Sequence, residues 1–179
     1  LASKIRVKID DAGFVNRACF SLAEKIGSAV VQCEAERRPA PVWLKMLNAW
    51  ASLAVFRPLL DRVGCSRFVS AYTGGHPISP DVIRFFRAVG LNLKQCYGLT
   101  ETCGIFQVQP DDQVKLETVG TSLPGTAVRI SEDQEVLVSG DTVFAGYHDD
   151  YDATRASFDQ GWLRTGDAGY LDSDGHLII

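Results

Sequence analysis

Residues 95–102 bring together four residue types that suit a nucleotide and a metal ion. An aromatic ring, a bare backbone, a hydroxyl and a carboxylate follow one another as Tyr97, Gly98, Thr100 and Glu101. A planar ring can lie against a base, and oxygen ligands suit a hard cation such as Mg²⁺. The apolar run at residues 89–93 predicts a short buried strand, so we expect this stretch at a strand end, where α/β sheets bind ligands. The structural alternative is a plain strand-to-turn junction.

A second stretch, residues 73–80, carries two glycines between an expected strand and an expected helix. The strand is predicted over residues 68–72 and the helix over about 81–89. Gly74 and Gly75 have no side chain, so the backbone there can approach a ligand closely. Strand, glycine turn, helix and strand predict a β–α–β unit with a right-handed crossover. Both stretches would then meet beyond the carboxyl ends of neighbouring strands.

Helical periodicity dominates the first 65 residues. Residues 1–38 are predicted to be helical, and residues 42–56 predict a second, amphipathic helical stretch. Prolines separate the two. Ser79, with a proline directly after it, is expected to cap the helix at 81–89. The segment at 42–56 has two interpretations: a helix packed on a core, or a helix lying on a membrane surface.

The sequence becomes β-rich after about residue 110. Short β-rich runs occur at residues 119–121, 127–130, 135–138 and 142–144. Their spacing predicts an antiparallel sheet or a small barrel. A short helix is predicted at 152–158, and a hairpin at 169–179 with an Asp-Ser-Asp-Gly turn. We therefore predict an α/β fold, with an α/β subdomain over residues 1–115 and a smaller β-rich subdomain over residues 116–179.

Composition excludes several classes of protein. Five scattered cysteines without paired spacing argue against a disulfide framework or a zinc site and predict a reducing, cytoplasmic compartment. No apolar run is long enough for a spanning helix, and the N-terminus has no signal-peptide core. The chain begins without Met and stops inside an apolar run, so we expect it to be a piece of a longer protein. No pattern indicates an oligomeric state.

Charge is unevenly distributed along the chain. Residues 1–95 carry 14 Lys and Arg against 7 Asp and Glu, whereas residues 96–179 carry 4 against 15. The basic half could attract phosphates or an anionic membrane surface, which gives a hypothesis of peripheral membrane contact through residues 42–60. It lacks the dense basic clusters interleaved with aromatic residues that mark nucleic-acid binders, so no nucleic-acid partner is expected.

Four motifs in one order carry a resemblance to a known family. They are residues 74–77 (Gly-Gly-His-Pro), 97–101 (Tyr-Gly-Leu-Thr-Glu), 119–125 (Val-Gly-Thr-Ser-Leu-Pro-Gly) and 162–167 (Trp-Leu-Arg-Thr-Gly-Asp). From about residue 40 to the end, the chain closely resembles the adenylate-forming (AMP-binding) superfamily of acyl-CoA synthetases, luciferases and peptide-synthetase adenylation domains. Residues 53–64 are similar to a segment of long-chain fatty acyl-CoA synthetases, so the chain looks most like part of such an enzyme.

The resemblance implies a nucleotide site. Tyr97 would lie against the adenine ring, and Asp167 would accept hydrogen bonds from both ribose hydroxyls. The glycine turn would line the adenine pocket and the neighbouring acyl channel with Gly74, Gly75, His76 and Pro77. His76 departs from the family, which more often has a small residue there. It could narrow the pocket, add a hydrogen bond, or have no special function.

The resemblance also implies the chemistry. Gly98 would leave room for the reacting carboxylate, Thr100 would offer its hydroxyl to phosphate, and Glu101 would hold Mg²⁺. A carboxylic acid, expected to be a fatty acid, would attack ATP to give an acyl-adenylate and pyrophosphate. The thiol of coenzyme A would then displace AMP. Trp162, Arg164 and Thr165 are expected to support the site rather than to contact the nucleotide.

The resemblance also indicates which parts of the family are absent from residues 1–179. The family's Ser/Thr/Gly-rich phosphate loop and the lysine of its C-terminal domain do not occur here, so we expect the isolated chain to be catalytically inactive and to bind ATP weakly at best. Two alternatives stay open within the superfamily: a fatty acyl-AMP ligase that transfers to a carrier protein, and a ligase for an aryl or short acid. An alternative of another class is a non-catalytic nucleotide-binding or scaffold module.

Overall fold

The structure is a computed structural model, and it describes residues 2–111 and 113–179. The chain forms two compact units. The first comprises Leu1–Ala71 and Ile78–Leu93, and the second comprises Tyr72–Pro77 and Lys94–Ile179. Helices make up most of the first unit, and strands make up most of the second. The predicted mixed α/β class is confirmed, whereas the division at residue 115 stays a prediction.

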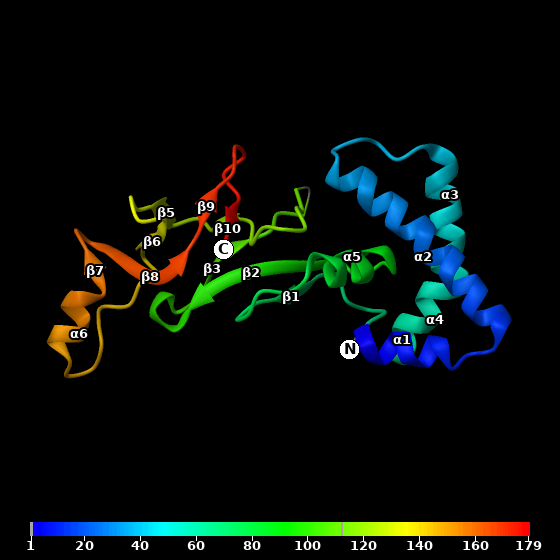
Figure 1. The fold of residues 1–179 in the computed structure, drawn as a ribbon, viewed down its shortest axis with the longest axis horizontal. Coiled ribbons are helices and arrows are strands. Elements are labelled where there is room, and N and C mark those ends of the chain that lie inside the picture. The colour runs from blue at the N-terminus through cyan, green and yellow to red at the C-terminus, as the bar shows by residue number, and fades with distance from the viewer. Residues whose placement is uncertain (1, 112) are drawn as a thin grey trace. The chain divides into compact units, whose positions relative to one another are not determined.

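The first unit is built from helices that lie together in Figure 1. They are α1 (Ala2–Asp10), α2 (Phe14–Ala35), α3 (Val42–Ala51), α4 (Arg57–Arg62) and α5 (Pro80–Ala88). A π-helical segment, η1 (Ser52–Phe56), joins α3 to α4 without a break. The helical character predicted for residues 1–38 is confirmed by α1 and α2, and the chain turns between them at Gly13, whose backbone is extended (φ −56°, ψ 155°).

Aromatic side chains form the centre of the core of the first unit. The Phe20 ring lies 6.5 Å from the rings of Phe56 and Phe85, measured between centroids. Helices α2 and α5 approach closely at Gly27, where an added Cβ would lie 2.1 Å from the carbonyl oxygen of Ala88. The core-packed interpretation of the helix after residue 42 is therefore correct for its inner face, which includes Phe56.

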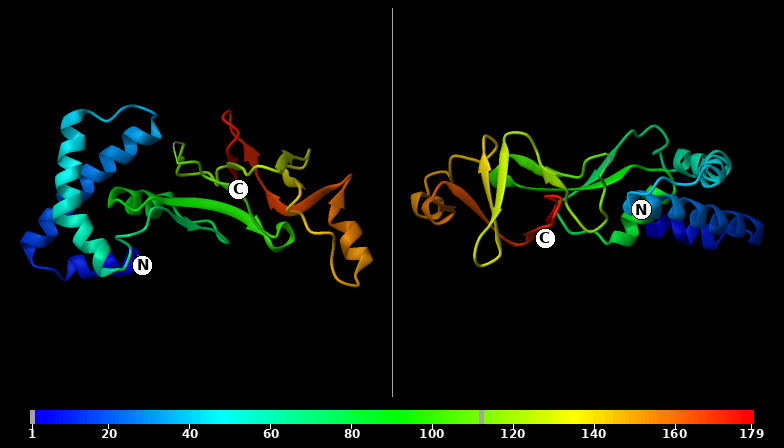
Figure 2. Two further views of the ribbon diagram at one scale, coloured as in Figure 1. Left: turned by 180° about the vertical axis from the view of Figure 1, so that it is seen from behind. Right: turned by 90° about the horizontal axis from the view of Figure 1, so that it is seen from above.

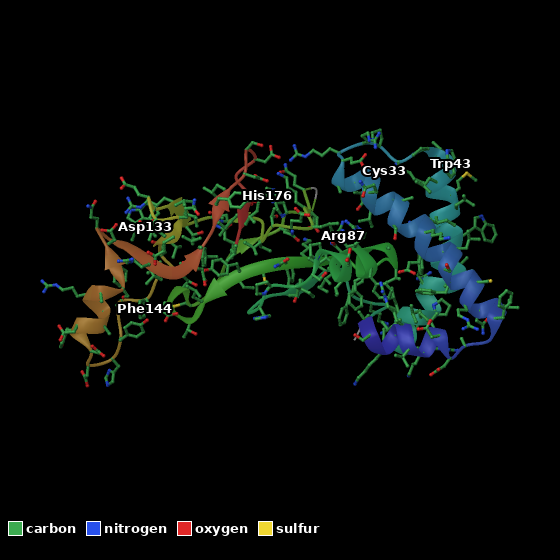
Figure 3. The ribbon with its side chains drawn as sticks, viewed as in Figure 1. Cys33, Trp43, Arg87, Asp133, Phe144 and His176 are labelled. Carbon is green, nitrogen blue, oxygen red and sulfur yellow. The ribbon has the colours of Figure 1, made fainter. Side chains whose placement is uncertain are left out.

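Large hydrophobic side chains are exposed on the outer face of α3 and η1, which also exposes Lys45. They are Val42, Trp43, Met46, Leu47, Trp50 and Leu53. Trp43 and Trp50 are 62% and 70% exposed, and Figure 3 labels Trp43 on α3. None of the helices in residues 2–111 and 113–179 has both the length and the apolar character needed to cross a membrane.

Two predicted strands are displaced. The strand predicted at residues 68–72 is the shorter β1 (Ala71–Thr73), because Phe68 closes a turn through its N–H to the carbonyl oxygen of Cys65 (3.2 Å). The strand predicted at residues 89–93 is the end of α5 and a turn. Gly90 has φ +92°, and its N–H and that of the next residue bond back to the helix. An apolar run of this length fits a helix end as well as a strand.

The strand that contains the predicted site residues Tyr97 and Gly98 is β2 (Leu93–Leu99), so residues 95–99 lie inside it rather than after it. Ala71 and Asn92 are joined by a backbone hydrogen bond, and Thr73 accepts from the Cys96 thiol, so β1 and β2 run in the same direction. The predicted β–α–β order, β1–α5–β2, is confirmed, and its handedness stays a prediction. Strands β3 (Gly104–Val108) and β4 (Thr121–Ser122) complete the sheet in the order β1-β2-β3-β4.

A second, antiparallel sheet follows, as predicted. Its order is β5-β6-β8-β7, from β5 (Thr126–Ile130), β6 (Glu135–Gly140), β8 (Trp162–Ala168) and β7 (Phe158–Asp159). Among the described strands this order has two free ends, so it is not a closed barrel. Figure 2 shows the sheet from two further directions. The strand-like run at 142–144 is wrong: it forms a turn and a loop that lead to the short helix α6 (Tyr151–Ala156).

The predicted C-terminal hairpin is confirmed. Strands β9 (Tyr170–Leu171) and β10 (Leu177–Ile178) pair antiparallel, and the Asp-Ser-Asp-Gly turn joins them. The hairpin is fixed to the neighbouring chain by two backbone bonds, from Val119 N to Leu177 O and from Leu177 N to Gly120 O, both 2.8 Å.

Candidate nucleotide site

A cavity of about 340 Å³ lies in the second unit. It is lined by six of the residues predicted from the sequence, namely Gly75, His76, Pro77, Tyr97, Gly98 and Asp167. They come from the turn after β1, from β2 and from β8, three parts of the chain far apart in sequence. A cavity of this size is within the usual range for small-molecule sites.

Tyr97 and Asp167 contact each other directly in this cavity. The Tyr97 hydroxyl donates a hydrogen bond to Asp167 Oδ2 at 2.5 Å. One side of the Tyr97 ring packs against Phe106, with centroids 4.9 Å apart and planes at 61°. Burial and the bond to the carboxylate raise the pKa of the Tyr97 hydroxyl, so it stays a protonated donor at neutral pH. The two residues predicted for adenine and ribose are thus one hydrogen-bonded pair.

The backbone of β8 holds Asp167 in place. The Asp167 N–H donates to Thr165 Oγ1 at 3.1 Å, and that hydroxyl donates to the carbonyl oxygen of Val136 at 2.8 Å. Gly166, with φ +75°, donates its N–H to Glu135 Oε1 at 3.0 Å. Thr165 and Gly166 are therefore bonded to β6, and Asp167 is bonded to Thr165. The supporting role predicted for Thr165 requires contacts of this kind.

Two side chains that precede that segment in β8 also make supporting contacts. Arg164 bonds Glu135 Oε2 through Nε at 3.0 Å and through a terminal nitrogen at 2.9 Å. The Trp162 ring lies under the Arg129 guanidinium at 4.7 Å. Neither residue lines the cavity.

The glycines of the two motifs are needed for close packing of the backbone. An added Cβ at Gly98 would lie 2.1 Å from the carbonyl oxygen of Gly104 on β3, at the bulge between Tyr97 and Gly98. An added Cβ at Gly74 would lie 2.8 Å from the Cys96 sulfur. The structure thus explains both glycines by neighbouring strands. The room that Gly98 would leave for a carboxylate stays a prediction.

Gly74 and Thr100 line a second, neighbouring depression that also includes Gly75 and Gly98. Thr100 begins the 3₁₀ turn η2 (Thr100–Thr102) directly after β2. The buried Thr102 hydroxyl holds this turn, because it accepts from Leu99 N at 2.9 Å and lies 2.7 Å from the carbonyl oxygen of Gly104. The turn therefore presents Thr100 at the surface beside the cavity.

Glu101 lines neither hollow. Its half-buried side chain accepts a hydrogen bond at Oε1 from the Tyr147 hydroxyl, at 2.8 Å. Its backbone carbonyl accepts from Phe144 N at 2.8 Å, and Figure 3 labels Phe144 in the loop before α6.

Comparison with known proteins decides the family. The model of the family described as AMP-binding enzyme matches residues 22–148. The chain belongs to the AMP-binding enzyme family. The long-chain-fatty-acid–CoA ligase FadD15 of Mycobacterium tuberculosis is 37% identical over 161 residues, which cover 89% of this chain and 26% of that protein. The 2-succinylbenzoate–CoA ligase of Listeria monocytogenes is 38% identical over 108 residues, covering 59% and 23%.

Solved structures of the o-succinylbenzoate CoA synthetase of Bacillus subtilis are also similar. Its complex with ATP and magnesium is 29% identical with a TM-score of 0.56. Its complex with the acyl-adenylate intermediate is 29% identical with a TM-score of 0.59. Each match covers 68% of this chain and 29% of the other. The chain spans about a quarter of the length of its curated relatives FadD15 (26%) and 2-succinylbenzoate–CoA ligase (23%). The resemblance to the AMP-binding superfamily is confirmed.

The donor set of this AMP-binding chain fits a magnesium ion only in part. No cluster of three His, Cys, Asp or Glu side chains occurs in the part of the chain that the structure describes. Glu101 supplies a carboxylate, and the preceding residue in sequence, Thr100, supplies a hydroxyl. Mg²⁺ typically takes one or two carboxylates together with substrate phosphates and water. The residues therefore fit an ion that arrives with a nucleotide.

Sequence reasoning missed several residues of the site. The cavity is also lined by Gln95, Cys96, Leu99, Glu117, Val119 and Ile179. Cys96 donates its thiol to Thr73 O at 3.3 Å, and burial raises the pKa of this thiol, which disfavours a nucleophile. Tyr147 was missed because it lies 46 residues from Glu101, and nothing local in the sequence indicates that contact.

Proposed function

We propose that this chain is the central part of an ATP-dependent ligase that joins a fatty acid to coenzyme A. The observation that carries the proposal is the Tyr97–Asp167 pair in a cavity next to the turn with Thr100 and Glu101. Long-chain specificity is supported by the identity to FadD15, which extends over 89% of the chain. We place the protein in the cytoplasm and propose peripheral membrane contact through residues 42–60.

In the first step, the fatty-acid carboxylate attacks the α-phosphorus of ATP and releases pyrophosphate. Tyr97 lies against the adenine ring, and Asp167 accepts hydrogen bonds from the ribose hydroxyls. The turn lines the adenine pocket and acyl channel with Gly74, Gly75, His76 and Pro77. These contacts orient the nucleotide so that the two reacting atoms stay close.

Thr100 and Glu101 act on the phosphate side of the same nucleotide. The Thr100 hydroxyl donates to a phosphate oxygen, and Glu101 is the protein ligand for Mg²⁺. When bound, this ion offsets negative charge on the phosphates. Gly98 leaves space beside the reacting carboxylate. No general base is required, because a carboxylic acid is already ionised at neutral pH.

In the second step, the thiol of coenzyme A attacks the acyl carbon and displaces AMP. The product is the acyl thioester. Tight phosphate binding and the choice of acceptor require the phosphate loop and the C-terminal domain of the family, which do not occur in residues 1–179. We therefore propose that the isolated chain is inactive.

A second candidate is a ligase for an aryl or short acid. It is favoured by the 38% identity to the 2-succinylbenzoate–CoA ligase and by the matches to the Bacillus subtilis enzyme. A fatty acyl-AMP ligase that uses a carrier protein shares the same first step. A non-catalytic scaffold stays a third candidate, although Thr100, Glu101 and Asp167 are all present.

The test is AMP release by the full-length protein with ATP, Mg²⁺, coenzyme A and a series of acids from acetate to stearate, plus 2-succinylbenzoate. We expect activity that peaks on long acids and falls at least a hundredfold in Asp167→Ala, because the ribose contacts are lost. Activity on 2-succinylbenzoate or short acids alone would select the second candidate. ATP binding without AMP release from any of these acids would point to another carboxylate or acceptor. No binding of Mg·ATP would select the scaffold.

A further inference from the structure

The loop at residues 141–150, between β6 and α6, contacts Glu101 at two atoms. The Tyr147 hydroxyl donates to the carboxylate at Oε1, and Phe144 N donates to the backbone carbonyl, each at 2.8 Å. The two residues of the side-chain contact are 46 positions apart in sequence. The loop therefore forms hydrogen bonds with both the backbone and the side chain of Glu101, the residue proposed to hold Mg²⁺.

The same loop holds Tyr147 in one position. The Tyr147 ring packs edge-on against Phe144 at 4.9 Å, and Phe144 stacks on Phe158 of β7 at 6.0 Å. Tyr147 N donates to Thr154 Oγ1 on α6 at 2.9 Å. Gly146 has φ +148°, and an added Cβ would lie 2.6 Å from Thr154 Cγ2. The position of the Tyr147 hydroxyl is thus set by three contacts: the packing of the ring, the backbone bond to Thr154, and the close approach of Gly146 to α6.

A fixed hydroxyl donor has a defined effect on a carboxylate. It occupies a lone pair of Oε1 and sets the plane of the group, so that fewer orientations remain to be lost when a cation binds. Hydrogen-bond partners of metal-binding carboxylates typically change metal affinity or activity by 10- to 100-fold.

We propose that Tyr147 is a positioning residue for Glu101, and that the loop at residues 141–150 orients this carboxylate for the magnesium ion that accompanies the nucleotide. The inference rests on the proposed function, because it requires Mg·ATP as the ligand. Tyr147 contacts neither reacting atom. Tyr147 contributes to the increase in ATP affinity that Mg²⁺ produces.

The experiment is calorimetric titration of the full-length protein with ATP, once with excess Mg²⁺ and once with EDTA. The quantity compared is the gain in ATP affinity that Mg²⁺ produces. In Tyr147→Phe, which keeps the ring and removes the hydroxyl, we expect that gain to fall about tenfold. Affinity in EDTA is expected to stay unchanged. The matched control is Tyr151→Phe, four residues on, whose side chain is 85% exposed.

A second variant separates positioning from stability. Glu101→Gln is expected to lose most of the magnesium gain, and adding Tyr147→Phe to it is expected to have little further effect on that gain, because both residues act on the same ion. An unaltered gain in Tyr147→Phe would overturn the proposal while leaving the proposed function intact. Equal weakening with Mg²⁺ and with EDTA would also overturn it, since that is the result of a merely structural contact. Failure of the wild type to bind ATP at all would overturn the proposed function, and the inference with it.

Discussion

At the scale of single residues, the Tyr97–Asp167 pair gives one side chain two tasks. The ring is proposed to lie against adenine, and the hydroxyl holds the carboxylate proposed to bind ribose, at 2.5 Å. Each carboxylate oxygen has two lone pairs, so Asp167 can keep the tyrosine bond while it accepts from a ribose hydroxyl. We therefore propose that the hydroxyl orients the Asp167 carboxylate before a nucleotide binds.

Tyr97→Phe tests this orientation because it keeps the ring and removes only the hydroxyl. We expect the affinity of the full-length protein for ATP to fall about fivefold, which corresponds to about 1 kcal/mol for one hydrogen bond. With 2′,3′-dideoxy-ATP, which offers no ribose hydroxyls, we expect no difference between the variant and the wild type. Both affinities are measured by calorimetry. Tyr170→Phe, at an exposed position on β9, is the control.

An equal loss with both nucleotides would contradict this account. It would mean that the hydroxyl supports the adenine contact or the fold rather than the ribose acceptor.

At the scale of elements, the β9–β10 hairpin is held by a charged group outside it. Lys115 pairs with Asp172 and, at 2.7 Å, with Asp174 in the hairpin turn. Asp172 Oδ1 also accepts from the N–H groups of Asp174 and His176, each at 2.9 Å. The Lys115 ammonium, followed by these backbone bonds, lowers the pKa of Asp172 to about 2.

This lowered pKa predicts a pH dependence of stability. The folded-state pKa of Asp172 lies below its usual value near 4, so its stabilisation is complete at neutral pH and is lost as the pH falls from about 4 to 2. Asp172→Asn should lower the free energy of unfolding by about 1 kcal/mol at pH 6 and by much less at pH 2. Urea unfolding midpoints at the two pH values measure it, with Glu132→Gln at the exposed β5–β6 turn as the control. A deficit of equal size at both pH values would argue against the ion pair.

At the scale of the whole molecule, charge and exposed apolar surface occur in the same part of the chain. Residues 1–95 carry 14 basic against 7 acidic side chains, and the exposed tryptophans Trp43 and Trp50 lie within that part. Tryptophan is favoured at membrane–water interfaces, and basic surfaces attract anionic lipids. These features support the proposal that residues 42–60 contact membranes peripherally.

Vesicle sedimentation tests the membrane proposal. The full-length protein should bind vesicles with anionic lipid at low ionic strength, and binding should weaken with added salt because the charges are screened. Replacing both Trp43 and Trp50 with Ser should reduce binding about tenfold or more, since each ring loses apolar contact. Phe14→Ser, at a 79% exposed position on α2, is the control. Wild-type protein that stays in the supernatant at low salt would remove the proposal.

Sequence alone predicted what depends on near neighbours in the chain. The helix α5 begins where Ser79 was expected to cap it, and Asp81 N donates to the Ser79 hydroxyl at 3.3 Å. The hairpin β9–β10 turns at the Asp-Ser-Asp-Gly stretch. Six predicted site residues line one cavity. They could be predicted from the sequence because the motifs that contain them resemble those of a known family.

Only the tertiary structure decided what depends on distant partners. The strand predicted at residues 89–93 begins at Leu93 instead, since Gly90 follows the helix end. The buried Lys94 after it finds a distant partner in the exposed Asp111. The Tyr147–Glu101 contact joins residues 46 positions apart. Local propensity depends on interactions between residues close in sequence. Contacts between distant residues, such as Tyr147 and Glu101, form only when packing brings separate elements together.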